Sequence, residues 1–247
     1  MSPEPDIAVP ARALGEPARA RIAAALLSGR QVPAGQLAQT AGVAVSTASE
    51  HLAVLLAAGI VQVEHQGRQR LYRLASDDVA RAVEALQVIA PSAPVRSLRQ
   101  ARVSVELRAA RTCYDHLAGD LGLHLTDVLV EAHVIPPLHV GMRVDAPEPF
   151  PAGPLVELLG VHPGTGPRPW ARGCLDWTGR RAHVAGQVGA QVLEALVSNG
   201  WVLRRSDTRA VRVTDTGQAR LLGLTATRQA AAPDHAPGEG SAAAGSR

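Results

Sequence analysis

Four side chains with chemical potential lie in two short segments of the second half of the chain. The segment RTCYDHLAGDLG contains Cys113 and His116, and the segment RGCLDWTGRRAHVAG contains Cys174 and His183. These are the only two cysteines of the chain. Thiolate sulfur and imidazole nitrogen are the ligands that zinc and other soft metal ions prefer. The four residues are therefore candidate metal ligands, for a soft metal or metalloid ion that would act as an effector.

The same residues allow three other interpretations. A thiol redox switch requires the Cα atoms of the two cysteines to lie within about 7 Å of each other. An enzyme would use Cys174 as a nucleophile, with His116 or His183 as its base. Buried structural thiols would need no chemistry at all, since free cysteine is among the most buried residue types. The sequence alone leaves these alternatives open.

The elements that position these residues are predicted from apolar spacing. Apolar residues recur in helical steps from Val103 to Leu121, which predicts one helix with Cys113, His116 and Asp120 along one side. A second helix is predicted from about Thr178 to Asn199, with Cys174 and Asp176 just before it. A thiol near that helix N-terminus and its arginines would have a lowered pKa.

The rest of this half is predicted from composition and turn signals. Residues 134 to 171 are rich in proline and glycine, which predicts loops around a short helix at PLVELLG. After Gly200, two short strands and a final short helix from Asp215 are predicted. The preceding helix, Gly200 and the two strands repeat the order of residues 55 to 74, which is helix, glycine, strand, turn and strand. A winged-helix-like half is therefore expected. Trp170, Trp177 and Trp201 either line an apolar pocket or belong to the core.

The first half carries a different signal, for DNA recognition. Residues 43 to 74 predict a recognition helix followed by a hairpin: the helix is amphipathic, with the apolar stripe Ala48, Leu52, Leu55 and Leu56, and it stops at Gly59. Two alternating strands follow, joined at Gln66 and Gly67, with arginines at or beside the tip of the hairpin. Short polar groups suit a major groove, and guanidinium groups suit phosphates. The predicted DNA-binding residues are Gln36, Val45, Ser46, Thr47, Ser49, Glu50, His51, Arg68, Gln69 and Arg70.

Two upstream helices complete the unit. EPARARIAAALLSG predicts a helix with Pro17 in its first turn, and PAGQLAQTAG predicts a shorter one that turns at Gly42. Helix, turn, helix and hairpin together make a winged helix-turn-helix.

The run from Ala13 to Leu74, notably LGEPARARI, STASEHLAVLLAAGIV and GRQRLYRL, resembles the ArsR-type winged-helix repressors. The resemblance implies a homodimer built on helices at residues 6 to 14 and 76 to 90, a double-stranded DNA operator, and release by an effector. Residues 36 to 40 lack the paired thiols of arsenic sensors, and residues 76 to 90 lack the histidines of zinc sensors. The cysteine segments resemble those of an extended ArsR-like subgroup with an added C-terminal domain, where a glutamate commonly stands in place of Gly179.

Charge and composition agree with a regulator. The formal net charge is only +3, and residues 1 to 90 hold eight arginines and eight acidic residues, so DNA affinity must come from the placement of the arginines. The chain has no lysine, which excludes a Walker A loop and Schiff-base chemistry. With no apolar run of about 20 residues and no leader, a cytoplasmic protein without a membrane partner is expected.

The predicted fold class is mainly α with small β-hairpins (α+β). The predicted domains are a winged helix-turn-helix DNA-binding and dimerisation domain (1–90), a linker (91–101), a C-terminal effector or dimerisation domain that is winged-helix-like (102–224) and a disordered tail (225–247). The predicted function is a DNA-binding transcriptional regulator, a homodimeric repressor and not an enzyme, released from its operator by a metal or metalloid, a redox change or a small molecule. The alternatives are an enzyme-like C-terminal domain with Cys174 as nucleophile, and a ligand-free dimerisation module.

Overall fold

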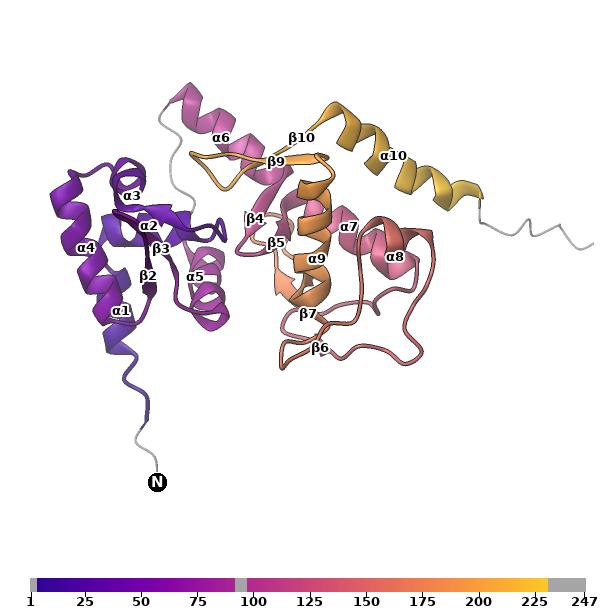
Figure 1. Cartoon of the computed structure of the whole chain (residues 1–247), viewed down its shortest axis with the longest axis horizontal. Helices are drawn as coiled ribbons and strands as arrows, with labels where there is room; N and C mark the ends of the chain where they lie inside the picture. The colour runs from indigo at the N-terminus through magenta and orange to yellow at the C-terminus, as the bar shows by residue number, and fades with distance from the viewer. Residues whose placement is uncertain (1–3, 92–96, 231–247) are drawn as a thin grey trace, which may run out of the picture.

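The chain folds into two domains that lie side by side (Figure 1). The structure is a computed structural model, and it describes residues 4–91 and 97–230. The N-terminal domain comprises α1 (Ala8–Leu14), α2 (Pro17–Leu26), β1 (Val32–Pro33), α3 (Ala34–Ala41), α4 (Val45–Ala57), β2 (Val61–Gln66), β3 (Gln69–Leu74) and α5 (Asp77–Ile89). Its three-stranded antiparallel sheet has the order β1-β3-β2.

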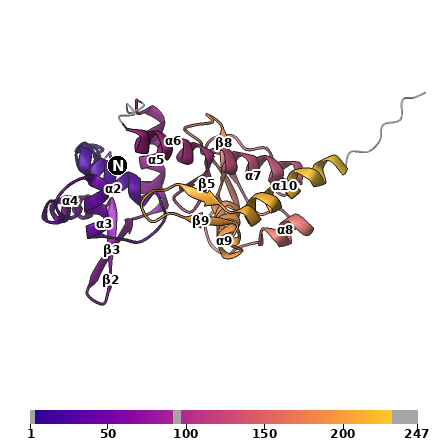
Figure 2. The same ribbon diagram turned by 90° about the horizontal axis from the view of Figure 1, so that it is seen from above.

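The N-terminal domain has the predicted winged helix-turn-helix plan. Pro17 opens α2, and Glu16 caps it by accepting a hydrogen bond from the Arg19 N–H at 2.9 Å. The apolar stripe of α4 packs with α2, α3 and the sheet in one core, where Leu52 and Leu55 are fully buried. The strands β2 and β3 pair from Val61 with Leu74 to Gln66 with Gln69, so the turn consists of Gly67 and Arg68, one residue later than predicted. Figure 2 shows this wing projecting from the body of the domain.

The C-terminal domain contains five helices and seven strands in the part of the chain that the structure describes. They are α6 (Leu98–Ala109), β4 (Arg111–Cys113), β5 (His116–Ala118), α7 (Gly119–Glu131), β6 (Arg143–Val144), α8 (Pro154–Leu158), β7 (Ala171–Leu175), β8 (Ala182–Ala185), α9 (Gly186–Ser198), β9 (Val202–Arg204), β10 (Val211–Val213) and α10 (Asp215–Ala230). The strands form antiparallel sheets of order β4-β5, β6-β7-β8 and β10-β9.

Two predicted helices of this domain are wrong. The apolar seam expected from Val103 to Leu121 is interrupted at Ala109, and residues 111–118 form the β4–β5 hairpin. The helix expected from Thr178 begins only at Gly186, because residues 182–185 form β8. All residues of β4, β5 and β8 are buried. A strand that is buried on both faces shows no alternation of polar and apolar residues. Its apolar residues therefore extend the apolar pattern of the neighbouring helix, and the sequence predicts one longer helix.

The C-terminal domain is built around a duplicated unit of hairpin and helix. The first copy is β4, β5 and α7, and the second is β7, β8 and α9, with helices of 13 residues each. The sequence His-Leu-Ala-Gly-Asp-Leu-Gly from His116 recurs as His-Val-Ala-Gly-Gln-Val-Gly from His183, 67 residues later. The hairpin turn is longer in the second copy, because Cys174 precedes His183 by nine positions and Cys113 precedes His116 by three.

The repeated glycines have the same structural role in both copies. Gly119 and Gly186 have φ values of +78° and +84°, a region that favours glycine, where each strand passes into its helix. A Cβ atom on Gly122 would lie 2.4 Å from the carbonyl oxygen of Leu117, and one on Gly189 would lie 2.6 Å from that of Val184. Each helix therefore approaches its own strand too closely for any side chain at this position.

The remaining segments position the two copies. The strands β9 and β10 pair between α9 and α10 as the predicted plan requires, although α10 has 16 residues and is not short. Helix α6 begins at Leu98, inside the predicted linker 91–101, and α10 includes residues 225–230 of the predicted disordered tail. Residues 92–96 and 231–247 lie outside the described residues. Among the described residues no single helix is long and apolar enough to cross a membrane; α3 and α4 reach that measure only together, with a bend of 101° between them.

We predict that Gly189→Ala destabilises the C-terminal domain. The new methyl group would meet the backbone of Val184 at 2.6 Å and the Cβ atom of His116 at 2.9 Å, and the backbone cannot rotate away as a flexible side chain could. Overpacking of this kind costs roughly 1–3 kcal/mol. Thermal or urea denaturation should show the loss. Gly35→Ala in α3 is the control, because nothing lies within 4 Å of its Cβ position. Equal stability of the two variants would contradict the close approach.

Candidate functional site

The predicted DNA-binding residues are distributed over α3, α4 and the wing. On α4, Val45, Ser46, Ser49 and Glu50 are exposed, and Thr47 is half-buried. Half-buried His51 is held 3.7 Å from the carboxylate of Glu16.

Of the four remaining predicted residues, three are on the wing and Gln36 is on α3. Arg68, Gln69 and Arg70 are exposed at its tip. Arg73 is different, because it pairs with Glu64 at 3.1 Å further down the hairpin. On α3, the amide of Gln36 donates a hydrogen bond to the carbonyl oxygen of Ser206 in the turn between β9 and β10. Gln36 thus also contacts the C-terminal domain.

The four candidate ligands converge at one point, although they do not lie on helices. Cys113 and His116 are directly paired across the β4–β5 hairpin, and Cys174 and His183 are directly paired across β7 and β8. One ligand atom from each of the four residues lies within 4.8 Å of all the others. Each copy of the duplicated unit therefore supplies one cysteine and one histidine to a shared site, which we call the Cys/His cluster.

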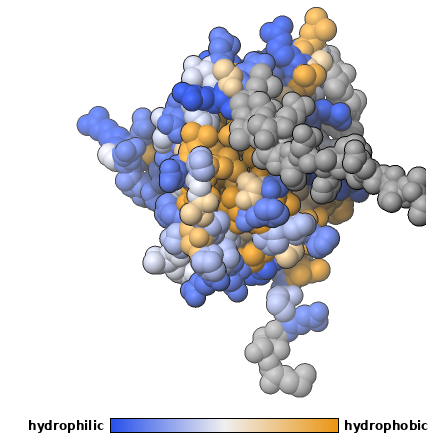
Figure 3. Space-filling view, turned by 90° about the vertical axis from the view of Figure 1, so that its right-hand side faces the viewer, coloured by the Kyte–Doolittle hydropathy of each residue, from blue (hydrophilic) through white to orange (hydrophobic). Residues whose placement is uncertain are grey.

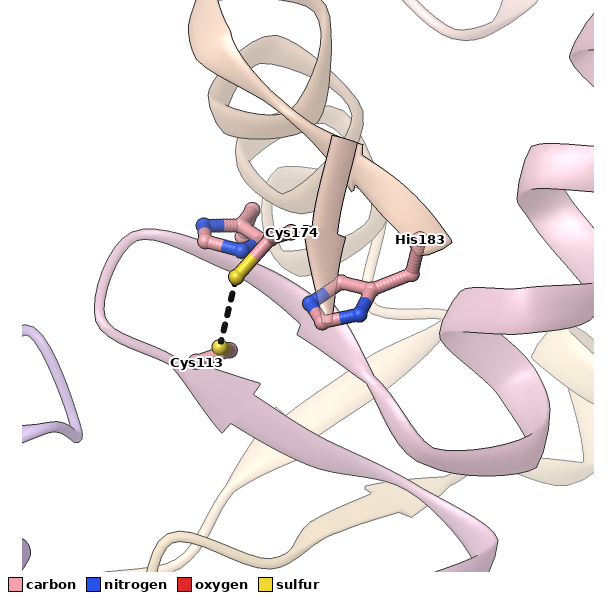
Figure 4. Close-up of side chains that lie close together, drawn as sticks. Cys113, Cys174 and His183 are labelled. Carbon is pink, nitrogen blue, oxygen red and sulfur yellow. Dashed lines mark hydrogen bonds between the residues drawn. The ribbon is translucent and has the colours of Figure 1, made fainter. Parts of the chain in front are cut away.

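The Cys/His cluster is compact enough to hold one cation among four ligands. The two sulfurs are 3.8 Å apart and face each other, with the imidazole of His183 beside them (Figure 4). Zinc–sulfur bonds of about 2.3 Å in a tetrahedron place two sulfurs ~3.8 Å apart. The rings of His116 and His183 are stacked with their centroids 5.0 Å apart. All four side chains are at most 6% exposed.

Several buried nitrogens of the cluster have no hydrogen-bond partner within the described chain. They are Nε2 of His116 and both ring nitrogens of His183. A buried polar atom without a partner costs about 1–3 kcal/mol, so each such atom calls for an explanation. The other nitrogen of His116, Nδ1, lies 3.1 Å from a carboxylate oxygen of Asp115, which Arg168 holds at 2.5 Å. A carboxylate on one ring nitrogen orients the other toward a metal in many metal sites.

The pKa values within the cluster are strongly shifted. Burial raises the pKa of the Cys113 thiol well above its ordinary value. The pKa of Cys174 is lowered, because the hydrogen bond from Cys113 and the neighbouring imidazoles outweigh burial. Burial opposes the charge on His116, yet the carboxylate of Asp115 raises its pKa to about 10. At His183 burial prevails and lowers the pKa, which keeps that imidazole neutral. A thiolate and a neutral imidazole are the forms that bind metals.

A fifth polar group reaches the cluster from the other domain. Glu84 on α5 is only 7% exposed, and its carboxylate contacts both sulfurs, with an oxygen 3.2 Å from that of Cys174 and the other against Cys113. Burial raises the pKa of Glu84 to about 7. The backbone of the β4–β5 turn also joins the domains, since the Tyr114 N–H donates to the carbonyl oxygen of Leu27 at 2.7 Å. The cluster therefore lies at the domain boundary.

A buried ion pair ties the two copies of the duplicated unit together. Asp176, just after β7, accepts hydrogen bonds from the Arg111 guanidinium at 2.8 Å and from the Gly119 N–H at 2.7 Å, both in the first copy. Its other oxygen accepts from the backbone N–H groups of Thr178 and Gly179, each at 2.8 Å. The guanidinium of Arg111 lies over the ring of Trp177 at 4.3 Å. These contacts hold the pKa of Asp176 well below its ordinary value.

Three expectations about this half need correction or completion. Cys113, His116 and Asp120 do not share a helix face, because the first two are on a hairpin and Asp120 is exposed on α7. The lowered pKa of Cys174 has a different cause from the predicted one, since this residue lies inside a sheet and not at a helix N-terminus. Trp170 and Trp201 are buried in the core.

Trp170 also lines a cavity of about 410 Å³ with apolar residues of the loops after α7. The space-filling view of this end of the domain shows apolar atoms gathered among polar ones (Figure 3).

Comparison with known proteins places the chain in a family. A family model described as a helix-turn-helix domain matches residues 14–64. An uncharacterized HTH-type transcriptional regulator of Bacillus subtilis, YdfF, is 38% identical over 217 residues, which cover 87% of this chain and 94% of that protein. The chain belongs to the HTH-type transcriptional regulators.

Two further similar proteins each match about a third of the chain. The HTH-type transcriptional regulator CmtR of Mycobacterium tuberculosis is 46% identical over 79 residues, which cover 32% of this chain and 66% of CmtR. A solved homodimeric winged helix-turn-helix domain of Mycobacterium bovis, a possible ArsR-family regulator, is 29% identical over 36% of this chain and 89% of its own, with a TM-score of 0.32. The predicted winged helix-turn-helix is confirmed by the elements of the N-terminal domain and by the matching family model.

The similarity to YdfF extends across both domains of the regulator. An alignment that covers 87% of the chain has to include the region from the first copy of the duplicated unit to the second. The C-terminal domain is therefore part of a regulator shared by the two proteins, and not an addition peculiar to this chain.

Sequence reasoning missed Glu84, and it assigned Asp115 and Asp176 no place among the ligands of the cluster, although Asp176 was noted beside Cys174. The repeated heptapeptide that starts at His116 and His183 is a signal that could have aligned the two segments. In that alignment a Cys-X-Asp sequence precedes each histidine. Cys113 then corresponds to Cys174, and Asp115 corresponds to Asp176. Nothing in the sequence indicates Glu84, because its position depends on the docking of the two domains.

We predict that Asp176→Asn destabilises the regulator by about 3–5 kcal/mol at neutral pH, because Arg111 would then be buried without a counterion. The pKa of Asp176 is lowered in the folded state, so its contribution is fully present above the ordinary aspartate pKa of about 4 and is lost as the pH falls below that value. The difference in unfolding free energy between wild type and variant, measured by urea denaturation, should therefore shrink in acid. A difference that stays constant down to pH 3 would contradict this assignment.

Proposed function

We propose that the regulator is a homodimeric cytoplasmic repressor that leaves its DNA operator when a soft divalent cation binds to the Cys/His cluster. One observation carries the proposal: a duplicated unit brings ligand atoms of two cysteines and two histidines within 4.8 Å of one another, with three buried imidazole nitrogens that have no hydrogen-bond partner among the described residues. A cation at the centre would satisfy these nitrogens and both sulfurs. Two nitrogens with two sulfurs are a donor set suited to zinc or cadmium.

DNA binding rests on the exposed face of α4 and the wing. The first turns of α4 present short polar side chains, as a helix in a major groove requires. The wing projects from the body of the domain (Figure 2), and its tip carries two exposed arginines, Arg68 and Arg70. Because arginines and acidic residues balance over residues 1 to 90, these two charges weigh heavily in the interaction with phosphates.

Dimerisation is supported by exposed apolar residues on the helices that flank the DNA-binding elements. Ile7 and Val9 at α1 are 80% and 42% exposed, and Leu86 and Ile89 on α5 are 46% and 78% exposed. Large apolar side chains exposed together on two helices are typical of an interface. A second copy of the chain on α1 and α5 would place one recognition helix in each half-site.

The geometry favours a metal over the other interpretations of the cluster. A disulfide between Cys113 and Cys174, whose sulfurs are 3.8 Å apart, would leave the buried nitrogens of both histidines unpaired. A nucleophilic Cys174 would need an open cleft for its substrate, whereas its side chain is 6% exposed. A ligand-free dimerisation module gives no reason for four metal-binding side chains to converge. We therefore propose a regulator, and no enzyme.

The wing is tested by the double variant Arg68→Ala with Arg70→Ala. Binding to double-stranded DNA from the promoter region of the chain's own gene should weaken, and the slope of log affinity against log salt should fall by ~2, since each lost phosphate contact removes about 0.9. Fluorescence anisotropy over a salt series measures both. Arg102→Ala, an exposed arginine on α6, is the control. Unchanged affinity and slope in the double variant would mean that the wing does not touch DNA.

The metal site is tested by titration with Cd(II) and Zn(II). One Cd(II) per chain should bind with ultraviolet thiolate absorption and should lower DNA affinity by about tenfold or more, within the usual range of allosteric coupling. Cys174→Ser and His183→Ala should abolish both effects. His139→Ala, which removes an exposed histidine, should change neither. If Cd(II) produces no thiolate absorption in the wild type, the cluster is not a metal site.

A further inference from the structure

The cavity of about 410 Å³ in the C-terminal domain has no role in the metal chemistry. It is lined by residues of α7, the loop after it, the strand β6 and Trp170 just before β7. Val134, Ile135 and Trp170 in this lining are buried, and His133 and Pro147 are exposed. The cavity therefore extends from the surface into the core. Its volume lies within the range of about 300–1,000 Å³ that is usual for small-molecule sites.

The walls of the cavity are held in place by the fold. Three of its nine lining residues are prolines, whose rings fix the backbone. Val144 of β6 is paired with Ala171 of β7. The indole of Trp170 packs edge to face against the ring of Phe150, with the centroids 5.0 Å apart. A cavity with rigid walls binds a ligand without the cost of ordering those walls first.

Two lining residues have polar side-chain groups, His133 and Trp170, and all the others are aliphatic. The indole N–H of Trp170 is buried and has no hydrogen-bond partner among the described residues. A buried indole N–H usually has a partner, so one without calls for an explanation. His133 takes a φ of +55° after the end of α7, in a conformation that favours glycine. Both residues carry a local cost, and both line the cavity.

We infer that this cavity is a second ligand site of the regulator, for an uncharged, mostly apolar molecule of one or two rings that carries a hydrogen-bond acceptor. The apolar part would fill the space between the aliphatic side chains, and the acceptor would pair with the indole N–H of Trp170. Within the described part of the chain no acidic residue or arginine lines the cavity, so a charged ligand would lose hydration without gaining a partner. The site is separate from the Cys/His cluster and does not depend on the proposed metal.

Trp170 also connects the cavity with the second copy of the duplicated unit. Its carbonyl oxygen accepts a hydrogen bond from the Val188 N–H at 3.0 Å, and the carbonyl oxygen of Pro169 accepts one from the Gln187 N–H at 3.1 Å. The first turn of α9 is thus attached to the cavity wall, and β7, which carries Cys174, begins at the next residue. A ligand in contact with Trp170 adds contacts to the frame that holds part of the cluster.

The probes for this site are acetophenone and ethylbenzene, which have nearly the same shape but differ in a carbonyl acceptor. Fluorine NMR of the full chain labelled with 5-fluorotryptophan reports on its three tryptophans, and single tryptophan-to-phenylalanine variants assign them. Acetophenone should shift the Trp170 resonance with a dissociation constant below about 1 mM. Ethylbenzene should bind at least about threefold more weakly, because it leaves the indole N–H unpaired.

The cavity itself is tested by Val144→Phe, which enlarges a lining side chain and so fills part of the space. This variant should lose about tenfold or more in acetophenone affinity, measured by ligand-observed NMR. Val140→Phe, at an exposed position outside the lining, is the matched control and should bind as wild type does. Trp170→Phe should bind the two probes with equal affinity. Cys174→Ser, which removes a proposed metal ligand, should keep acetophenone binding.

Three results would overturn the inference. They are a Trp170 resonance that does not move at about 2 mM acetophenone, undiminished binding by Val144→Phe, and equal affinity of the wild type for the two probes. The test with Val144→Phe remains decisive if Trp170→Phe does not fold. A wild type that binds acetophenone but not Cd(II) would refute the metal site and leave the cavity site standing.

Discussion

The rest of the structure depends on the burial of unpaired ligand atoms where the two copies of the duplicated unit meet. Imidazole nitrogens and sulfurs are normally solvated or paired, and here four residues carry them in a space that is nearly closed to water. Such an arrangement is expensive unless something completes it. The ion pair of Arg111 and Asp176 holds the two copies together beside the cluster, so the ligand atoms cannot separate to reach water. The fold thus holds the ligand atoms in place before any ligand arrives.

The duplication explains how a small domain builds a site with four ligands. In each copy a cysteine and a histidine are paired across a hairpin, and the helix that follows is forced close to the hairpin by two glycines. One copy can offer two ligands, which bind a cation weakly. Two copies together offer four ligands. Because the copies are alike, the two cysteines lie beside each other and the two histidine rings stack. The longer turn in the second copy, from Leu175 to Ala182, provides Asp176, Thr178 and Gly179 for the contacts to the first.

Much of the N-terminal domain could be predicted from the sequence, because its helices expose one face and so show the helical period clearly. The C-terminal domain could not, since β4, β5 and β8 are buried on both faces and their apolar residues extend the pattern of the adjacent helices. The four ligands were identified by residue type, while the elements that carry them were wrong. Their convergence depends on the packing of two hairpins about 60 residues apart in the sequence, which local spacing does not encode. Glu84 depends on domain docking and is still further from any local pattern.

The contacts between the domains explain why control of DNA binding can reside far from the recognition helix. The C-terminal domain touches the N-terminal domain at several places, among them Glu84 and Gln87 on α5, the backbone of Leu27 and Ser28 after α2, and Gln36 on α3. The two backbones also approach closely, since a Cβ atom on Gly29 would lie 2.0 Å from the carbonyl oxygen of Tyr114. Among these residues of the N-terminal domain, Glu84 alone contacts the sulfurs, so a change at the cluster reaches α5 directly. Because α5 shares one apolar core with the recognition helix α4, that contact connects the cluster to the DNA-binding elements.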